Sequence, residues 1–199
     1  MYGDRRVDLA VLHYSNSTVG ISLAFGNVSF AQQIVILGSG NSHYLAVGDF
    51  NGDHRQDLAT VMELLQHYKL LEHVGDLNHN NNLGLTSGNC GSGTISIFIG
   101  NGGGTFQSQM GYRFRGYSYS AAIVDINGDN TMDIIVTGSS SVYIGIYLDY
   151  GNGTFVWPVY FITSGYPEDL AISDFNNDGR LDVATSQFAG AVDISINVY

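Results

Sequence analysis

Short apolar runs alternate along the chain with stretches of glycine, asparagine, aspartate and serine. Runs such as Thr94–Ile99 and Val142–Leu148 are rich in β-branched and aromatic residues and are bounded by turn-forming residues. This pattern is typical of β-strands. Long helices use more alanine, glutamate and lysine than this chain offers, since only 13% of its residues are charged. The pattern therefore predicts an all-β fold.

The strands recur at a constant spacing. Acidic loops end at Asp8, Asp57, Asp133 and Asp182, and 49 residues separate both the first pair and the last pair. Within the longer gap between the pairs, residues 76–84 (D-L-N-H-N-N-N-L-G) align with the same loop. Their final glycine again lies 49 residues before Asp133. The chain therefore consists of repeated units of about 49 residues.

A second landmark repeats with the loops, namely a Gly-Asn turn that closes on a phenylalanine. Phe30, Phe106 and Phe155 each lie 19 residues before the first aspartate of the next acidic loop. Each unit then contains four strands, with the acidic loop joining the first strand to the second. Four-stranded units of this length are typical of β-propeller blades. We expect about four antiparallel blades in one array over residues 1–199, as a partial or small propeller, with units at roughly 1–38, 39–74 (shortened), 75–111, 112–163 and 164–199.

The segment 62–73 departs from the repeat. Its leucines and charged residues sort onto two faces of a helix, which favours a short helical or irregular patch. In the alternative alignment, Gln66–Val74 matches Ser39–Val47 and is the incoming strand of the next blade. The helical or irregular patch is the reading we favour from the sequence.

The acidic loops carry the candidate chemistry. Three intact loops place oxygen-bearing side chains at positions one, three, five and nine, and a backbone carbonyl at position seven is a further donor. The donor positions are Asp49, Asn51, Asp53, Arg55 and Asp57; Asp125, Asn127, Asp129, Thr131 and Asp133; Asp174, Asn176, Asp178, Arg180 and Asp182. Ca²⁺ takes about six to eight such oxygens. The loops hold nine of the 18 acidic residues, which accounts for half of the acidity behind the net charge of −11.

The loops followed by L-A, I-I or V-A, together with the turns G-N-G-T-F and G-N-G-G-G-T-F, resemble FG-GAP (VCBS-type) repeats. That resemblance covers nearly the whole chain except 62–72. It implies calcium-loaded β-propeller blades like those of integrin α-subunit heads, with about three Ca²⁺ ions held in the intact loops. It also implies an extracellular adhesion or binding module that recognises a protein or a glycan.

Other readings of the loops fit less well. An EF-hand needs a glutamate at position twelve and flanking helices, but position twelve is Thr60, Val136 or Thr185. A metal-free Asp/Asn-rich turn remains an alternative, although carboxylates crowded into one loop repel each other without a cation. The glycine-rich run before Phe106 lacks the Lys-Ser/Thr of a phosphate-binding loop.

The remaining residues favour a non-catalytic protein. The six histidines form no H-E-x-x-H motif, and no G-x-S-x-G motif occurs. The pairs Arg5/Arg6 and Arg113/Arg115 are too few to suggest nucleic-acid binding. Arg113 and Arg115 form a candidate surface for a sugar or a protein with four tyrosines: Tyr112, Tyr117, Tyr119 and Tyr166. The start of the chain has no signal-peptide pattern, no apolar run reaches membrane-span length, and Cys90 is the only cysteine.

Two rival functions follow from the same features. One is a lectin-like accessory domain of a secreted hydrolase. The other is a decayed structural repeat without a ligand, suggested by the shortened second unit. Unpaired strands at the two ends of the array predict self-association unless they are capped.

Overall fold

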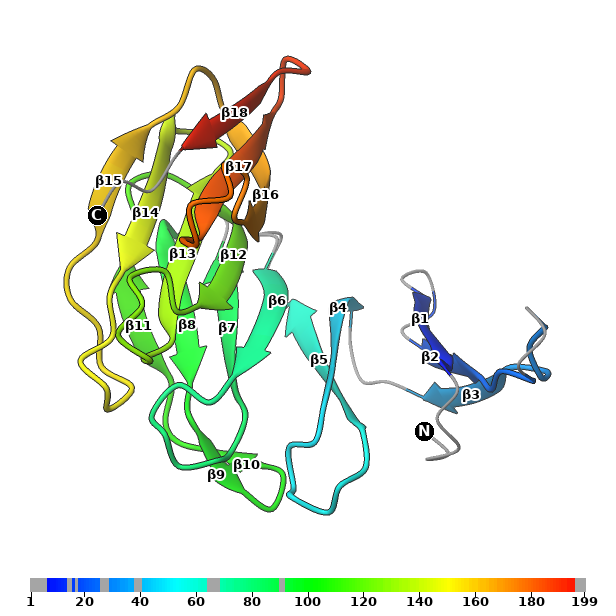
Figure 1. The fold of residues 1–199 in the computed structure, drawn as a ribbon. Helices are drawn as coiled ribbons and strands as arrows, with labels where there is room; N and C mark the ends of the chain where they lie inside the picture. The colour runs from blue at the N-terminus through cyan, green and yellow to red at the C-terminus, as the bar shows by residue number, and fades with distance from the viewer. Residues whose placement is uncertain are drawn as a thin grey trace.

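The computed structural model describes residues 7–13, 16, 18–25, 29–37, 41–63, 69–89 and 92–195 (Figure 1). Its strands form five successive antiparallel sheets, which we number in chain order. The first sheet contains β1 (Leu9–His13), β2 (Thr18–Ser22) and β3 (Ile34–Leu37), and the second contains β4 (Asn41–Gly48) and β5 (Asp57–Glu63). No α-helix occurs in the described residues, and the all-β prediction is confirmed.

The third and fourth sheets each have four strands. The third runs in the order β11 (Met110–Arg113), β8 (Thr94–Phe98), β7 (Gly84–Asn89) and β6 (Lys69–Gly75). The fourth runs from β12 (Ser118–Val124) through β13 (Asp133–Gly138) and β14 (Tyr143–Tyr147) to β15 (Val159–Ile162). The fifth contains β16 (Pro167–Ser173), β17 (Asp182–Gln187) and β18 (Val192–Ser195). In addition, β9 (Gly100–Gly102) and β10 (Thr105–Phe106) form a separate small hairpin.

The strand order confirms the predicted blade. In the third and fourth sheets the strands pair with their sequence neighbours, apart from the small β9–β10 hairpin. The acidic loops 49–57, 76–84, 125–133 and 174–182 join the first strand of a sheet to the second. The result is a propeller-like repeat array of antiparallel blades.

The helical reading of 62–73 is wrong wherever the structure describes this segment. Residues 62–63 end β5, and residues 69–73 belong to β6, which pairs antiparallel with β7. Residues 64–68 lie outside the described part. The alternative alignment was the correct one. Pairing with β7 satisfies the backbone of β6 in the sheet, and this long-range interaction overrides a helical pattern only about three turns long.

The second to fifth sheets stack face to face, and the hydrophobic core is buried between neighbouring sheets. We call the side of a sheet that faces the next sheet along the chain its front, and the opposite side its back. One cluster lies between the second and third sheets (Ala46, Phe50, Leu85). A larger one lies between the third and fourth sheets, around Ile97, Val136 and Tyr147. A third joins the fourth and fifth sheets (Ile126, Ile135, Ile144, Val183).

The first sheet stands apart from this stack, on the far side of β4 and β5 from the fifth sheet (Figure 1). Apolar side chains are exposed on both of its faces, among them Ile34 and Val35, which are neighbours on β3. Among the described residues, no helix is long and apolar enough to cross a membrane.

Candidate metal centre

The four acidic loops share one backbone conformation. Their fourth and sixth residues all have positive φ: Gly52 and His54, His79 and Asn81, Gly128 and Asn130, Asn177 and Gly179. Glycine and asparagine tolerate this left-handed region best, so their frequency at these positions follows from the turn. Gly179, for example, has φ of 86°.

Hydrogen bonds from the backbone to the acidic side chains hold this shape. In loop 125–133, Asp125 Oδ1 accepts from the Asp129 amide (3.1 Å) and its Oδ2 accepts from the Asn130 amide (2.9 Å). Asn127 Oδ1 also accepts from the Asp129 amide, and Asp129 Oδ1 accepts from the Thr131 amide. The same four bonds occur in loops 49–57 and 174–182. The predicted donors of each intact loop are therefore gathered around one turn.

The aspartate at position nine closes each intact loop. Its Oδ2 accepts from the amide of the loop's second residue: Asp57 from Phe50 (3.1 Å), Asp133 from Ile126 (3.2 Å) and Asp182 from Phe175 (3.0 Å). Asp133 and Asp182 are fully buried. This aspartate begins the second strand, so it connects the loop to the core.

Loop 76–84 keeps the same backbone with a different set of side chains. Asp76 accepts from the amides of Asn80 and Asn81, as position one does in the other loops. The side-chain Nδ2 of Asn80 donates to Gly100 O at 2.8 Å. A Cβ on Gly84 would lie 2.7 Å from Phe98 O, so no aspartate fits at position nine without a shift. With one carboxylate, this loop does not need a cation to relieve repulsion.

Local hydrogen bonds keep the exposed loop carboxylates ionised. The Arg180 guanidinium, with help from Asn176, lowers the pKa of Asp178 to about 2. The hydroxyl and amide of Thr131 lower the pKa of Asp129. Burial opposes ionisation of Asp49, but hydrogen bonds from three backbone amides outweigh it and lower its pKa. Each loop therefore carries concentrated negative charge at neutral pH.

Asp133 is the exception. Burial is the main cause that raises its pKa to about 6; the nearby charges of Asp129 and Asp125 act in the same direction, and hydrogen bonds from the amides of Asp149 and Ile126 act against them. A cation among these three carboxylates would reverse the repulsion that disfavours the ionised form.

This shift predicts a pH dependence for the metal-free chain. Between pH 4 and 6 the folded state binds the Asp133 proton while the unfolded chain, with the ordinary pKa of 3.8, has released it. Stability therefore falls as pH rises through this window, by about 3 kcal/mol at most. Urea unfolding in chelator at pH 4, 5 and 6 measures the slope, and Asp133→Asn should flatten it. An unchanged slope in this variant would contradict the assignment.

The oxygen atoms of each intact loop are chemically suited to bind a hard cation. Each intact loop offers three carboxylates, one amide oxygen and a carbonyl, all of them oxygen donors of the kind that Ca²⁺ prefers. The side chains are engaged within the loop: Asn127 Nδ2 donates to Asp129 Oδ2 (2.9 Å), and Asn176 Nδ2 donates to Asp178 Oδ2 (3.0 Å). Among the described residues, no three acidic, histidine or cysteine side chains converge as a metal site. Binding would therefore require the position-five carboxylate to leave its hydrogen-bond partners.

The structure also brings together the two repeated landmarks of the sequence, the acidic loops and the Gly-Asn turns. The Gly104 amide, in the Gly-Asn turn of the third sheet, donates to Phe50 O in loop 49–57 of the second sheet (2.9 Å). In the fourth sheet's turn, a Cβ on Gly153 would lie 3.2 Å from Asn78 Cβ in the third sheet's acidic loop. Each turn thus packs on the acidic loop of the preceding sheet. In the sequence, the two landmarks are linked by the shared 49-residue period and by the constant 19-residue spacing from each turn to the next loop.

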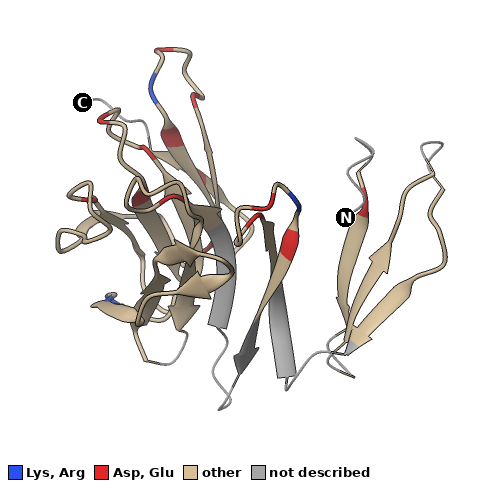
Figure 2. Ribbon diagram, turned by 90° about the horizontal axis from the view of Figure 1, so that it is seen from below, with Lys and Arg blue, Asp and Glu red and all other residues tan. Residues whose placement is uncertain are grey.

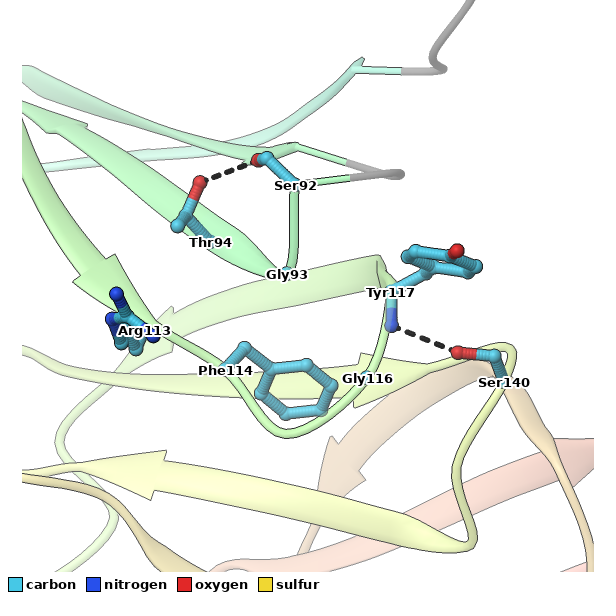
Figure 3. A pocket seen from close by; sticks show the side chains of 8 residues that line it. All are labelled: Ser92, Gly93, Thr94, Arg113, Phe114, Gly116, Tyr117 and Ser140. Atoms are coloured by element: carbon cyan, nitrogen blue, oxygen red, sulfur yellow. Dashed lines mark hydrogen bonds between the residues drawn. The ribbon is translucent and has the colours of Figure 1, made fainter.

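The predicted aromatic surface is only partly assembled. Tyr112 is partly buried and packs against the core, with its ring edge-on to Tyr147 and Phe155. The Arg115 guanidinium stacks on Tyr143, 4.6 Å from the ring centre. Tyr117 and Tyr166 are exposed, and Tyr117 lines an open hollow of about 570 Å³ with Arg113 and Phe114 (Figure 3).

That hollow lies at the end of the strands opposite to the acidic loops. Its other lining residues are small or hydroxyl-bearing: Ser92, Gly93, Thr94, Gly116 and Ser140. Figure 3 shows Ser140 Oγ accepting from the Tyr117 amide (3.0 Å), and Ser92 Oγ bonding to Thr94 Oγ1 (2.7 Å). Acidic residues lie mainly in loops and at strand ends, with few basic residues among them (Figure 2).

A family model for the FG-GAP-like repeat matches residues 1–60, 76–136 and 125–185, well over half of the chain. The chain belongs to the FG-GAP-like repeat family. The resemblance seen in the loops and turns is thereby confirmed, and repeats of this family are typical of extracellular proteins.

Comparison with other proteins adds little to the family assignment. No curated protein matches the FG-GAP chain. Among solved structures, a mutant form of the Photorhabdus luminescens Tc holotoxin pore is similar, with 16% sequence identity and a TM-score of 0.45. The match covers 94% of this chain and 8% of the toxin chain.

Proposed function

We propose that this FG-GAP chain is a calcium-stabilised, non-catalytic binding module that works outside the cell and recognises a protein or glycan ligand. The observation that carries the calcium part is the comparison among the four loops. Three loops carry side-chain oxygens at positions one, three, five and nine, and all four loops share one backbone conformation. The fourth loop reaches that backbone conformation with one amide (Asn80) and one glycine (Gly84) in place of two carboxylates, which is the substitution expected where no ion compensates the charge.

Calcium in these loops has a structural role in this proposal. Each ion would be held by the side chains at positions one, three, five and nine and by the carbonyls of Arg55, Thr131 or Arg180. Because position nine begins the second strand and position one follows the first, the ion would tie the two strands together. The turn of the next sheet packs on loop 49–57, so the ion there would also stabilise contact between neighbouring blades.

Calcium titration calorimetry tests this assignment through its stoichiometry. We expect three ions per chain. Asp125→Asn should weaken one of the three binding events by about tenfold or more, because the ion loses one of three negative charges. Asp76→Asn in the fourth loop is the matched control and should leave all three events unchanged. If Asp76→Asn and Asp125→Asn have equal effects, or if no heat of binding appears, the calcium assignment fails.

A glycan ligand, as in a lectin-like accessory domain, is the second candidate. The hollow in Figure 3 favours it, because the hollow combines hydroxyl groups with the exposed ring of Tyr117, and sugars hydrogen-bond to hydroxyls and stack on aromatic rings. A glycan array with the wild type, Tyr117→Ala and the control Tyr166→Ala tests it. Binding that is lost only in Tyr117→Ala supports this site, and an empty array with the wild type excludes it.

A further inference from the structure

The open hollow beside Tyr117 presents a cation next to hydroxyl groups (Figure 3). Arg113 is exposed there, and within the described residues no ion pair or hydrogen bond engages its guanidinium. By contrast, Arg180 is bonded to Asp178 at 2.9 Å, and the guanidinium of Arg115 stacks on a tyrosine ring. None of the residues that line the hollow is acidic. The hollow is therefore suited to an anionic ligand.

The acidic loops do not oppose an anion at this site, because they lie at the opposite end of the strands. β7 connects the two ends with six residues, from Gly84 to Asn89. At about 3.3 Å per residue, the two ends are about 16 Å apart. Electrostatic interactions at physiological ionic strength are screened over about 8 Å. The negative charge of the loops is thus largely screened at the hollow.

A network of polar side chains continues from the hollow along β7 and β8. Thr94 Oγ1 accepts from Asn89 Nδ2 (2.9 Å) and bonds to Ser92 Oγ (2.7 Å). Asn89 Nδ2 also donates to Ser96 Oγ (2.8 Å). Asn89 is only 8% exposed, yet among the described residues its Oδ1 has no hydrogen-bond partner, and neither has the buried Oγ of Ser87. Buried oxygens without partners favour a ligand that carries hydrogen-bond donors.

The small second sheet explains why this part of the third sheet is polar. By the 49-residue repeat, Asn89 corresponds to Gly138 at the end of β13. Gly138 lies under the ring of Phe114, which directly follows the last strand of the third sheet. Ser87 likewise corresponds to Val136, which is fully buried. In the described part of the chain the second sheet has two strands, so it offers no such ring to the third sheet, and polar groups take the place of an apolar contact.

We infer that the hollow binds an acidic saccharide, whose carboxylate pairs with Arg113 while its hydroxyls bond to the neighbouring serine and threonine side chains. This inference rests on the glycan-binding function proposed above and names the class of sugar. A guanidinium holds a carboxylate through two parallel hydrogen bonds, whereas a neutral sugar would leave Arg113 without a partner. Sugar hydroxyls both donate and accept, which matches the hydroxyl and amide groups of the network. The exposed ring of Tyr117 offers a stacking face beside them.

An array of paired oligosaccharides tests this inference. Each pair consists of an oligosaccharide that ends in a uronic or sialic acid and its carboxyl-reduced derivative, in which the acid has become a neutral alcohol. The wild-type chain should bind the acidic member at least about tenfold more tightly, because reduction removes the charge that pairs with Arg113. Arg113→Gln should lose this preference and bind both members equally weakly. A poly-glutamate peptide serves as a carboxylate probe without sugar hydroxyls.

Arg115→Gln is the matched control, because its guanidinium is occupied on the ring of Tyr143. This variant should retain the preference of the wild type for acidic sugars. Arg113 and Arg115 are both exposed, so both variants should fold, which circular dichroism melting checks.

The outcomes separate this inference from the glycan proposal. Equal binding of the wild type to acidic and carboxyl-reduced sugars overturns the inference and leaves the glycan proposal standing. A preference for acidic sugars that survives in Arg113→Gln overturns the placement of the carboxylate in this hollow. Binding to poly-glutamate but to no sugar, or no binding at all, overturns the inference and the glycan proposal together.

Discussion

Tyr147→Ala is expected to lower the free energy of unfolding by about 3–5 kcal/mol. Tyr147 is the largest of the fully buried side chains, and it lies in the cluster between the third and fourth sheets. Its ring contacts Tyr112 edge-on, and its hydroxyl donates to Arg113 O (2.8 Å), so the alanine variant loses both the packing and a buried hydrogen bond. Urea unfolding monitored by circular dichroism measures the change.

Tyr150→Ala is the matched control, because Tyr150 lies three residues away and is exposed. Its effect should stay within about 0.5 kcal/mol. Similar losses in both variants would mean that the third and fourth sheets do not pack through Tyr147, and the stacked arrangement of the blades would then be wrong.

The period of the repeat is the part of the fold that the sequence predicts best. Position nine of the loop begins the second strand in the second to fifth sheets, and in the three intact loops an aspartate there bonds back to the loop's second amide and fixes where the strand starts. The order of strands within a blade follows from the same spacing. These features are local, so short-range sequence patterns report them.

The features that sequence reasoning missed depend on distant partners. The strand at 69–75 exists through its pairing with β7, and its own residues are equally compatible with a short helix. Tyr112 resembles a surface aromatic in the sequence, but the next sheet covers it with Tyr147 and Phe155. Which side chains a neighbouring blade buries cannot be read from one unit alone.

The candidate site was predicted residue by residue, but its internal bonding was not. Spacing alone places Asp125, Asn127, Asp129 and Asp133 in one loop. It does not reveal that Asn127 bonds to Asp129, or that burial raises the pKa of Asp133. The pKa shift of Asp133 arises because the start of β13 is buried in the core.

Calcium is expected to have the other large effect on stability. A ligand that binds only the folded state stabilises it by about 2.7 kcal/mol per site at a free concentration of 100 times the Kd. Three equivalent sites would add about 8 kcal/mol. For a chain of this length, such a gain raises the melting temperature by at least about 15 °C. Removing the metal should therefore leave a chain that unfolds at a much lower temperature, with loops 49–57, 125–133 and 174–182 opening first.

The most direct test is the melting temperature of the wild-type chain in excess calcium and then in excess chelator, at the same pH and ionic strength, with magnesium as the control ion. Calcium should raise the melting temperature strongly, and magnesium should raise it much less because it demands a smaller octahedral site. Equal melting temperatures in calcium and in chelator would contradict the claim that the acidic loops of this repeat are calcium sites.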